Sequence, residues 1–436
     1  GVVITPDDIR AHAPLERAAK GVAITQYEKE TARACGLIKI DLLGNRGLSA
    51  AAESMRVIRR RDGVELNPER APAQDAATAE LLRRADTVGV NQLESPAMRR
   101  LLLQLQPERP AAVMQALALI RPGAASLGMK EAFIRRARGL DRVPQLDARV
   151  DEILAETHGI MLYEDEALRL VGALAGLPPA EADRFRRAVT KHRSDDERRE
   201  LSDTFLGYCA LNGMDTGLAA DLWTQMAKFN GYSFCRAHAA SYAQLAWFNT
   251  YLKAHHPLPF WVGALNNNQG LYDKWVYVEE ARRQGIRILP PCVNCAADEF
   301  VIAGADAIRI GLGRVRELSE RSRRAIYAGR PFAHLVDLLA RVPLQYREAE
   351  HLIRSGALDE FDSNRRQLLY ELTTGYDAAR RHRRRQDDEL LSPPAATAPA
   401  LRELPESTRQ RDAWRLLGLT PERHRSEEHT SELQSL

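Results

Sequence analysis

Hydrophobic and polar positions divide the chain into a short strand-like part and a long helical part. Residues 1–47 hold short apolar runs, "GVVI", "GVAITQY" and "GLIKIDLLG", that are separated by turns. The last run, residues 36–44, predicts a buried strand that ends in a glycine-marked turn. Side chains alternate along a strand, so Lys39 and Asp41 share one face of it. This pair indicates either a partly exposed ion pair or part of a metal and phosphate site, which would need further carboxylates.

Helical periodicity dominates residues 48–285. The stretch "ESPAMRRLLLQL" has the helical period and places Pro96 in its first turn. The stretch "PPAEADRFRRAV" predicts another helix, because proline and acidic residues favour a helix start. Residues 237–257 predict a long amphipathic helix that Pro257 closes.

The remaining chain predicts a smaller module followed by a linker. Residues 286–310 mix short β-type runs, and paired short helices with glycine turns follow as far as residue 361. From about residue 366 the chain is Arg-rich, including "RRHRRR", and then Pro- and Ala-rich, which is typical of a linker with short helices. The whole pattern predicts an α+β fold that is predominantly α-helical.

The two ends of the chain suggest a fragment of a longer protein. The chain begins at Gly1, without an initiating methionine and inside a predicted strand. Residues 425–436, "RSEEHTSELQSL", have no periodicity and resemble the translation of a sequencing adapter. They are therefore left out of the fold prediction, as an artificial tail would be.

Composition narrows the choice of partners and compartment. The 62 Lys and Arg residues nearly balance 59 Asp and Glu, so a surface that binds anions must come from local clusters. No apolar run approaches the roughly 20 residues of a membrane span. Five scattered cysteines predict a reducing, cytoplasmic compartment. The stretch "CVNC", residues 292–295, has no second cysteine pair and no nearby histidine, so it does not by itself predict a four-ligand zinc site.

A basic cluster occurs in "ADRFRRAVTKHR", which begins at Ala182. Arg184, Arg187 and Lys191 fall on one side of the predicted helix, and Arg186 adds to the positive field. Guanidinium groups match phosphate oxygens, so this face could bind a polyphosphate. From charge alone, an ordinary solvated face explains the cluster equally well.

Two further segments suggest nucleotide or DNA contacts. In "FNGYSFCRAHAASYA", aromatic residues, Arg236 and His238 surround a helix start, which suits either a nucleotide or a packed core. In "GLGRVRELSERSRRAI", a Gly-x-Gly turn is followed by basic residues, as in a helix-hairpin-helix that offers backbone N–H groups to a DNA phosphate. The candidate DNA contacts of this turn are Gly311, Gly313, Arg314 and Arg316.

Taken in order, these motifs resemble the bacterial replicative DNA polymerase III alpha subunit and its error-prone relatives. The resemblance runs from Gly1 to about Phe361. It rests on "TQYEKE", "GLIKIDLLG", "GVNQLESPAM", "ALIRPGA", "HGIMLYEDEAL", "EADRFRRAVTK", "FNGYSFCRAHAASYA", "YLKAHHP", "ILPPCVN" and "LIRSGALDEF". Each motif alone is unspecific, whereas the whole set in this order is a specific signal.

The resemblance implies site residues and cofactors. In this family three palm aspartates hold two Mg²⁺ ions for nucleotidyl transfer, and the third follows a Lys-x-Asp strand. Asp41 would then be a catalytic metal ligand. The implied nucleotide contacts are Lys39, Arg186, Arg187, Tyr232 and His238. The implied partners are primer–template DNA and dNTPs, with a sliding clamp and other replisome or mutasome subunits as further candidates and no membrane.

The resemblance also implies a domain order. It predicts the end of a palm at residues 1–47, a fingers domain at 48–285 and a helix-hairpin-helix region at 286–365. A linker or partial C-terminal region would fill residues 366–424.

Some family features are absent or altered. The chain lacks the "PDxDxDF" motif that supplies the other two aspartates, so we expect the isolated chain to have no polymerase activity. "QDDELL" has the leading glutamine of a clamp-binding peptide but no terminal aromatic residue. Cys292 stands where the family usually has Asp, which suggests a divergent member. The alternative function is a noncatalytic DNA-binding or scaffold protein that retains the fingers and hairpins.

Overall fold

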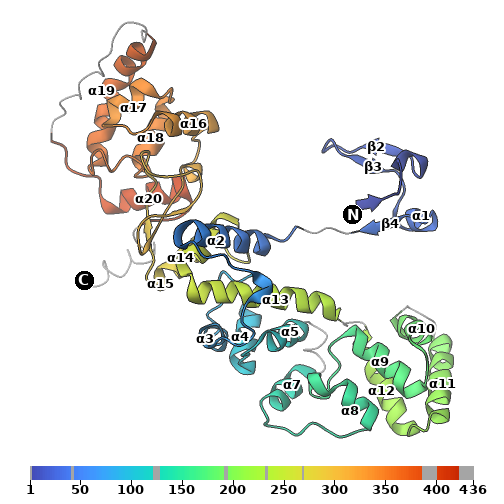
Figure 1. Cartoon of the computed structure of the whole chain (residues 1–436). Coiled ribbons are helices and arrows are strands. Elements are labelled where there is room, and N and C mark those ends of the chain that lie inside the picture. The colour runs from blue at the N-terminus through green and yellow to red at the C-terminus, as the bar shows by residue number, and fades with distance from the viewer. Residues whose placement is uncertain are drawn as a thin grey trace. The chain divides into compact units, whose positions relative to one another are not determined.

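The computed structural model describes residues 2–40, 44–120, 128–190, 195–230, 234–267, 270–384 and 400–421. The protein is mostly helical with small sheets, which confirms the predicted α+β, predominantly α-helical fold (Figure 1). The chain forms two compact units, Gly1–Arg46 and Gly47–Leu436. Each unit is described by itself below.

The first unit contains two small antiparallel sheets and one short helix. Strand β1 (Val2–Ile4) pairs with β4 (Ile38–Ile40), and β2 (Leu15–Arg17) pairs with β3 (Ala23–Thr25). Helix α1 (Lys29–Ala34) precedes β4, and a 3-10 turn, η1, spans Ile9–Ala11. Strands β1, β3 and β4 occur within the three apolar runs of the sequence, whereas β2 (Leu15–Arg17) was not predicted.

The expected burial of the strand at residues 36–44 is wrong for the residues that the structure describes. All three residues of β4 are exposed, and 69% of Ile38 and 39% of Ile40 are accessible to solvent. The reason is that, among the described residues, β4 belongs to a sheet of two strands, β1 and β4, and such a pair offers little surface against which to bury its side chains. Lys39 lies opposite Val3 in this pairing.

The second unit begins with a long helical part. Its α-helices are α2 (Arg46–Asp62), α3 (Ala76–Arg83), α4 (Pro96–Leu105), α5 (Pro110–Leu119), α7 (Met129–Ala137), α8 (Ala148–Ile153), α9 (Glu164–Ala175), α10 (Pro179–Thr190), α11 (Asp195–Leu211), α12 (Thr216–Asn230), α13 (Arg236–His255), α14 (Pro257–Asn267) and α15 (Lys274–Arg283). Short 3-10 helices, η2 (Pro68–Arg70) and η3 (Ala155–Thr157), interrupt the connections.

Helix α13 lies at the centre of this part. It packs against α3, α5 and α14 (Figure 1). The predicted amphipathic pattern is wrong for its second half, where Leu245 to Thr250 are all buried, as are Leu252 and Lys253. A helix that is covered on all sides needs no polar face, so the neighbouring helices make its polar residues, such as Lys253, part of the interior.

A second, smaller core joins α8 to α12. It includes Leu170 and Leu174 of α9, Ala182 of α10, Phe205 of α11 and Leu222 of α12. Phe205 stacks on Trp223 with ring centroids 4.8 Å apart. Helix α10 therefore contributes Ala182 to this core.

The C-terminal part combines a three-stranded sheet with short helices. The sheet has the order β5–β7–β6, formed by β5 (Arg287–Leu289), β6 (Val301–Ile302) and β7 (Ala307–Arg309). The 3-10 turn η4 (Leu312–Arg314) leads to α16 (Glu320–Gly329), α17 (Leu335–Arg341) and α18 (Tyr346–Arg354). This agrees with the mixed segment and the paired helices that the sequence predicted.

The Arg-rich stretch that suggested a linker forms a packed helix. Helix α19 (Arg365–Arg384) contacts α17 and α18 and buries Leu368, Leu372 and Ala379. Arg383 donates hydrogen bonds to the carbonyl oxygens of Leu339 and Val342, at 3.0 and 2.6 Å. Helix α20 (Glu406–Leu417) packs on α18. The expected adapter tail and "QDDELL" lie outside the described residues.

Candidate functional site

A cavity of about 650 Å³ opens beside the first two turns of α13. Its walls come from the loop before α4, from the end of α5, from the start of α13 and from the segment before α15. The polar and aromatic residues that line it are Asn91, Gln92, Glu94, Ser95, Phe234, His238 and Tyr242. Two motifs of the sequence analysis, "GVNQLES" and "FCRAHAASYA", therefore meet at one site.

An aromatic row forms one wall of the cavity. The ring of His238 lies edge-on to Phe234, with centroids 5.7 Å apart, and to Tyr242, with centroids 4.6 Å apart. The spacing of four residues places all three on one side of the helix start. His238 is exposed, so it is not a buried core histidine. Such rings present faces on which a nucleobase could stack.

The opposite wall carries amide and carboxylate groups. The Oδ1 atom of Asn91 is buried and has no hydrogen-bond partner among the described residues. Glu94, in contrast, accepts hydrogen bonds from the N–H of Gly89, from the N–H of Leu271 and from the hydroxyl of Tyr277, at 3.1, 2.7 and 3.1 Å. Glu94 therefore builds the wall, whereas Asn91 lines the cavity with its Oδ1 atom buried and without a hydrogen-bond partner among the described residues.

Arg236, the first residue of α13, is surrounded by carboxylates that neutralise its charge. Arg236 donates a hydrogen bond to Glu156 at 2.8 Å and lies 3.6 Å from both Asp165 and Glu166. Its guanidinium also lies 4.8 Å from the centre of the Tyr163 ring. With carboxylates on this side, Arg236 holds α13 to α9 and is poorly placed to attract a phosphate.

Glu166 is the most buried carboxylate of this group. Burial raises its pKa, although the N–H groups of Leu162 and Tyr163 donate to it at 2.8 and 3.0 Å and Arg236 stabilises its charge. The backbone of Tyr163 forms a bridge with that of Phe234, and the N–H of Glu164 donates to the Phe234 carbonyl at 3.0 Å. This network fixes the backbone from which His238 projects.

Of the residues that the resemblance implied as nucleotide contacts, the structure describes the surroundings of His238 most fully. His238 lines the cavity described above, while α10, which carries Arg186 and Arg187, contributes Asp183 to a different cavity of about 520 Å³ around Arg236. The side chains of Arg186 and Arg187 lie outside the described part, as do Tyr232 and Asp41. Lys39 belongs to the first unit. These assignments stay predictions.

The Gly-x-Gly turn has a structural role in the described chain. The N–H of Leu312 donates to the carbonyl of Ala297 at 2.8 Å, and that of Gly313 donates to the carbonyl of Asp298 at 3.0 Å. A Cβ atom on Gly311 would lie 2.2 Å from the same Asp298 oxygen. The expectation that this turn offers its N–H groups to a phosphate is therefore wrong for Gly313, whose N–H is already used.

Of the two arginines after this turn, only one presents an exposed side chain. Arg314 is half-buried and its Nε atom has no hydrogen-bond partner among the described residues. Arg316 is exposed, and its backbone N–H donates to the Leu416 carbonyl at 2.9 Å. Arg316 is therefore the better-placed candidate for a DNA phosphate.

The sequence analysis did not identify Asn91 as a residue of the candidate site. "GVNQLES" was noted as a motif, but nothing in its local pattern indicates that Asn91 lines the same cavity as His238. Among the described residues, no helix is both long enough and apolar enough to cross a lipid bilayer.

Three family models match successive parts of the chain. Residues 1–44 match the bacterial DNA polymerase III alpha NTPase domain, residues 48–213 match the bacterial DNA polymerase III alpha subunit finger domain, and residues 285–368 match a helix-hairpin-helix motif.

The curated relatives of the chain are named as DNA polymerases. The chain is 32% identical to an error-prone DNA polymerase of Symbiobacterium thermophilum over 87% of its own length and 37% of the relative. It is 35% identical to a DNA polymerase III subunit alpha of Thermus aquaticus over 84% of its length and 31% of the relative. A DNA polymerase III subunit alpha of Pseudomonas aeruginosa is 34% identical over 82% of the chain and 32% of the relative. The chain thus spans about a third of these relatives.

Proposed function

The chain belongs to the bacterial DNA polymerase III alpha subunit family, and from this premise we propose that it supplies the fingers and the helix-hairpin-helix region of a DNA-directed DNA polymerase. The reaction is template-directed nucleotidyl transfer, in replication or in error-prone synthesis. Within this proposal the palm ends near residue 47, the fingers extend to about residue 285 and the helix-hairpin-helix region extends to about residue 365.

The observation that carries the proposal is the cavity at the start of α13. Its aromatic row suits a nucleobase, whose faces stack on rings, and the polar residues Asn91 and Gln92 line the same cavity. We assign the incoming dNTP to this site. Lys39, Arg186 and Arg187 remain the proposed contacts of the triphosphate, and Tyr232 remains, with His238, a proposed residue of the nucleotide pocket.

Asp41, the residue proposed to bind a metal ion, belongs to the first unit. A divalent ion, Mg²⁺ by resemblance, needs more than one carboxylate to hold it beside the phosphates. The described residues of β4 and of its partner β1 include no carboxylate, and Lys39 lies opposite Val3. The described residues therefore do not make up this site by themselves, and Asp41 would be one ligand among several. We propose that the chain alone does not extend a primer.

Nucleotide binding in the presence of DNA tests the proposal. The pure chain is mixed with a fluorescent primer–template, and its DNA affinity is measured with and without the complementary dNTP. We expect DNA binding that weakens with salt and that the complementary dNTP strengthens. DNA affinity that no dNTP changes would support a noncatalytic DNA-binding or scaffold protein instead.

A primer-extension assay on the same samples tests the inactivity of the isolated chain. With Mg²⁺ and all four dNTPs, we expect no extension. Extension by the pure chain would overturn this part of the proposal, because the metal site would then be complete within it.

A further inference from the structure

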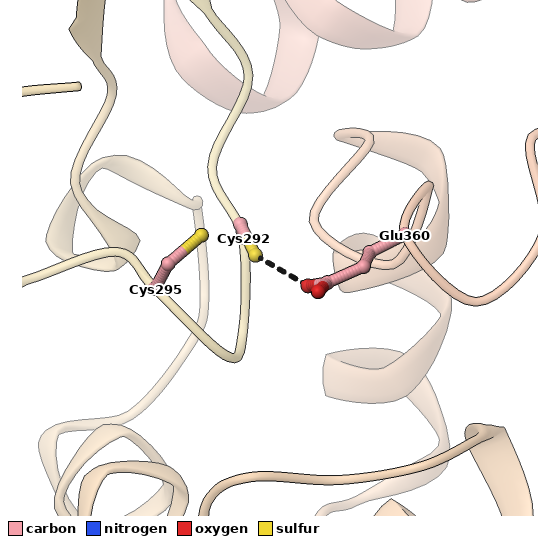
Figure 2. Close-up of side chains that lie close together, drawn as sticks. All are labelled: Cys292, Cys295 and Glu360. Atoms are coloured by element: carbon pink, nitrogen blue, oxygen red, sulfur yellow. Dashed lines mark hydrogen bonds between the residues drawn. The ribbon is translucent and has the colours of Figure 1, made fainter. Parts of the chain in front are cut away.

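The "CVNC" stretch forms a tight turn after β5 with both thiols on one side. The N–H of Ala296 donates to the carbonyl of Cys292 at 2.8 Å and closes the turn. Cys292 is buried and Cys295 is exposed. Figure 2 shows the thiol of Cys292 between that of Cys295 and the carboxylate of Glu360. The turn therefore brings two metal-ligating groups together at the surface.

A third ligand comes from a distant part of the chain. Glu360 follows α18, and its Oε2 atom lies 3.1 Å from the sulfur of Cys292. One ligand atom from each of Cys292, Cys295 and Glu360 lies within 4.8 Å of the other two. In a tetrahedral zinc site the ligand atoms lie about 3.3 to 3.8 Å apart. A movement of about one ångström would bring these three to that spacing.

The backbone holds the two segments together independently of these side chains. The N–H of Val293 donates to the carbonyl of Ala357 at 3.0 Å. The side chain of Asn294 both donates to the carbonyl of Phe332 and accepts from its N–H, at 3.0 and 2.8 Å. The three ligands thus lie on a preformed frame, which lowers the ordering cost of binding an ion.

We propose that Cys292, Cys295 and Glu360 form a zinc site whose fourth ligand comes from solvent. Two sulfur atoms favour a borderline or soft ion over Mg²⁺ or Ca²⁺, and zinc accepts thiolate and carboxylate ligands together. Cys295 and Glu360 are exposed, so water can reach the remaining position. This site goes beyond the proposed polymerase function and does not depend on it.

Binding of the ion exchanges protons for metal. In the free site the thiol of Cys292 donates a hydrogen bond to Glu360. Burial raises the pKa of Cys292 to about 12, with further contributions from Cys295 and Glu360. Zinc binds thiolates, so its binding would release protons, and Zn²⁺ with two thiolates and one carboxylate carries one net negative charge. Arg330, which donates to the Ala296 carbonyl at 2.9 Å, places a positive charge at the same turn.

Zinc binding should cross-link two segments of the C-terminal part. The ion would join the turn after β5 to the segment after α18, which lie close to the two ends of the region that matches the helix-hairpin-helix model. A ligand that binds only the folded state stabilises it in proportion to its affinity and concentration.

Cobalt is a suitable probe of this site. The whole chain, reduced and freed of metal, is titrated with Co²⁺ and followed by its sulfur-to-cobalt charge-transfer absorption. We expect one equivalent to bind and Zn²⁺ to displace it. Cys292→Ser and Cys295→Ser should abolish the absorption, and Glu360→Gln should weaken binding at least about tenfold. Cys35→Ser, in the first unit, is the matched control and should change nothing.

Thermal unfolding separates loss of the site from loss of the fold. The metal-free Glu360→Gln variant should unfold at the same temperature as the metal-free original chain, and Zn²⁺ should raise that temperature less in the variant than in the original. Absence of the charge-transfer absorption would overturn the proposal. So would equal cobalt affinity in the original chain and in Glu360→Gln, or immediate formation of a Cys292–Cys295 disulfide that binds no metal.

Discussion

The ammonium group of Lys253 lies 3.0 Å from a carboxylate oxygen of Asp86, although Lys253 lies at the C-terminal end of α13 and Asp86 follows α3. None of the lysine side chain and only 10% of the aspartate side chain is accessible to solvent. The same ammonium donates to the carbonyl oxygens of Asp86 and Val88, at 2.9 and 3.0 Å. These bonds anchor the segment that leads to Asn91 and to the cavity.

Replacing this lysine should destabilise the helical part strongly. In Lys253→Met the carboxylate of Asp86 loses its buried partner and the Val88 carbonyl loses its donor, so we expect the free energy of unfolding to fall by about 3 to 5 kcal/mol. Urea unfolding followed by tryptophan fluorescence measures the change. Lys228→Met, at an exposed position on α12, should change the value by less than about 0.5 kcal/mol. Similar effects of the two variants would contradict the prediction.

The Lys253–Asp86 pair should also make the free energy of unfolding depend on pH. Burial alone would raise the pKa of Asp86, but the charge of Lys253 and hydrogen bonds from Arg283 and Lys253 outweigh it and hold the pKa well below its usual range. A lowered folded-state pKa stabilises the fold above the unfolded-state pKa of about 3.9, and this contribution is lost as the pH falls below it. We expect the free energy of unfolding, measured between about pH 6 and about pH 2, to fall less in Asp86→Asn than in the original chain.

His238→Ala tests the assignment of the nucleotide. Loss of a ring that stacks on a base typically costs about 1 to 3 kcal/mol, so the dNTP concentration that strengthens DNA binding should rise roughly tenfold or more. Ser241→Ala, exposed on the same helix, should leave it unchanged. An unchanged dNTP requirement in His238→Ala would remove the cavity from the proposed function, even if the chain still bound DNA.

Arg316→Ala tests the DNA contact of the C-terminal part. If its exposed side chain neutralises one phosphate, affinity should fall about equally for all DNA sequences, and the slope of log affinity against log salt should decrease by about 1. Anisotropy titrations at several salt concentrations give this slope. Arg60→Ala, exposed on α2, removes the same charge elsewhere and should not alter it. A sequence-dependent effect of Arg316→Ala would indicate a base contact instead.

Two glycines should respond oppositely to the same substitution. In Gly263→Ala the new Cβ would lie 2.3 Å from the Ala50 carbonyl oxygen and from Ser54 Oγ, so we expect a loss of about 1 to 3 kcal/mol as α14 moves away from α2. Gly207 lies within α11 with open space around it, and Gly207→Ala should stabilise by about 0.5 to 1 kcal/mol. Denaturant unfolding of both variants checks the opposite signs.

Local sequence signals were enough to place most helices. Helix α4 is an example, because Ser95 accepts the Met98 N–H at 3.2 Å and Pro96 occupies the first turn, as the sequence predicted. The signals failed where burial depends on distant neighbours. The apolar residues of β4 indicated a core strand, yet burial needs another layer, and no described element of its unit buries Ile38.

The candidate sites depend even more on distant contacts. The resemblance pointed to His238, but Asn91 becomes a candidate only because the fold places its loop opposite α13. In the same way "CVNC" lacked further ligands in its own sequence region, and Glu360 joins it only through the packing of the segment after α18. Side-chain chemistry can be read from a sequence, whereas the pairing of remote side chains depends on the fold.

The central position of α13 has a consequence for synthesis of the chain. Helices α3 and α5 pack against it, yet more than a hundred residues separate the end of α5 from its start. At ribosomal rates of about 5 to 20 residues per second, the nascent α5 waits roughly 6 to 23 s for this partner, and α3 waits longer. Their apolar faces stay uncovered during that interval, so we expect holding chaperones to bind this stretch of the nascent polypeptide. Release should follow once α13 has emerged from the ribosome.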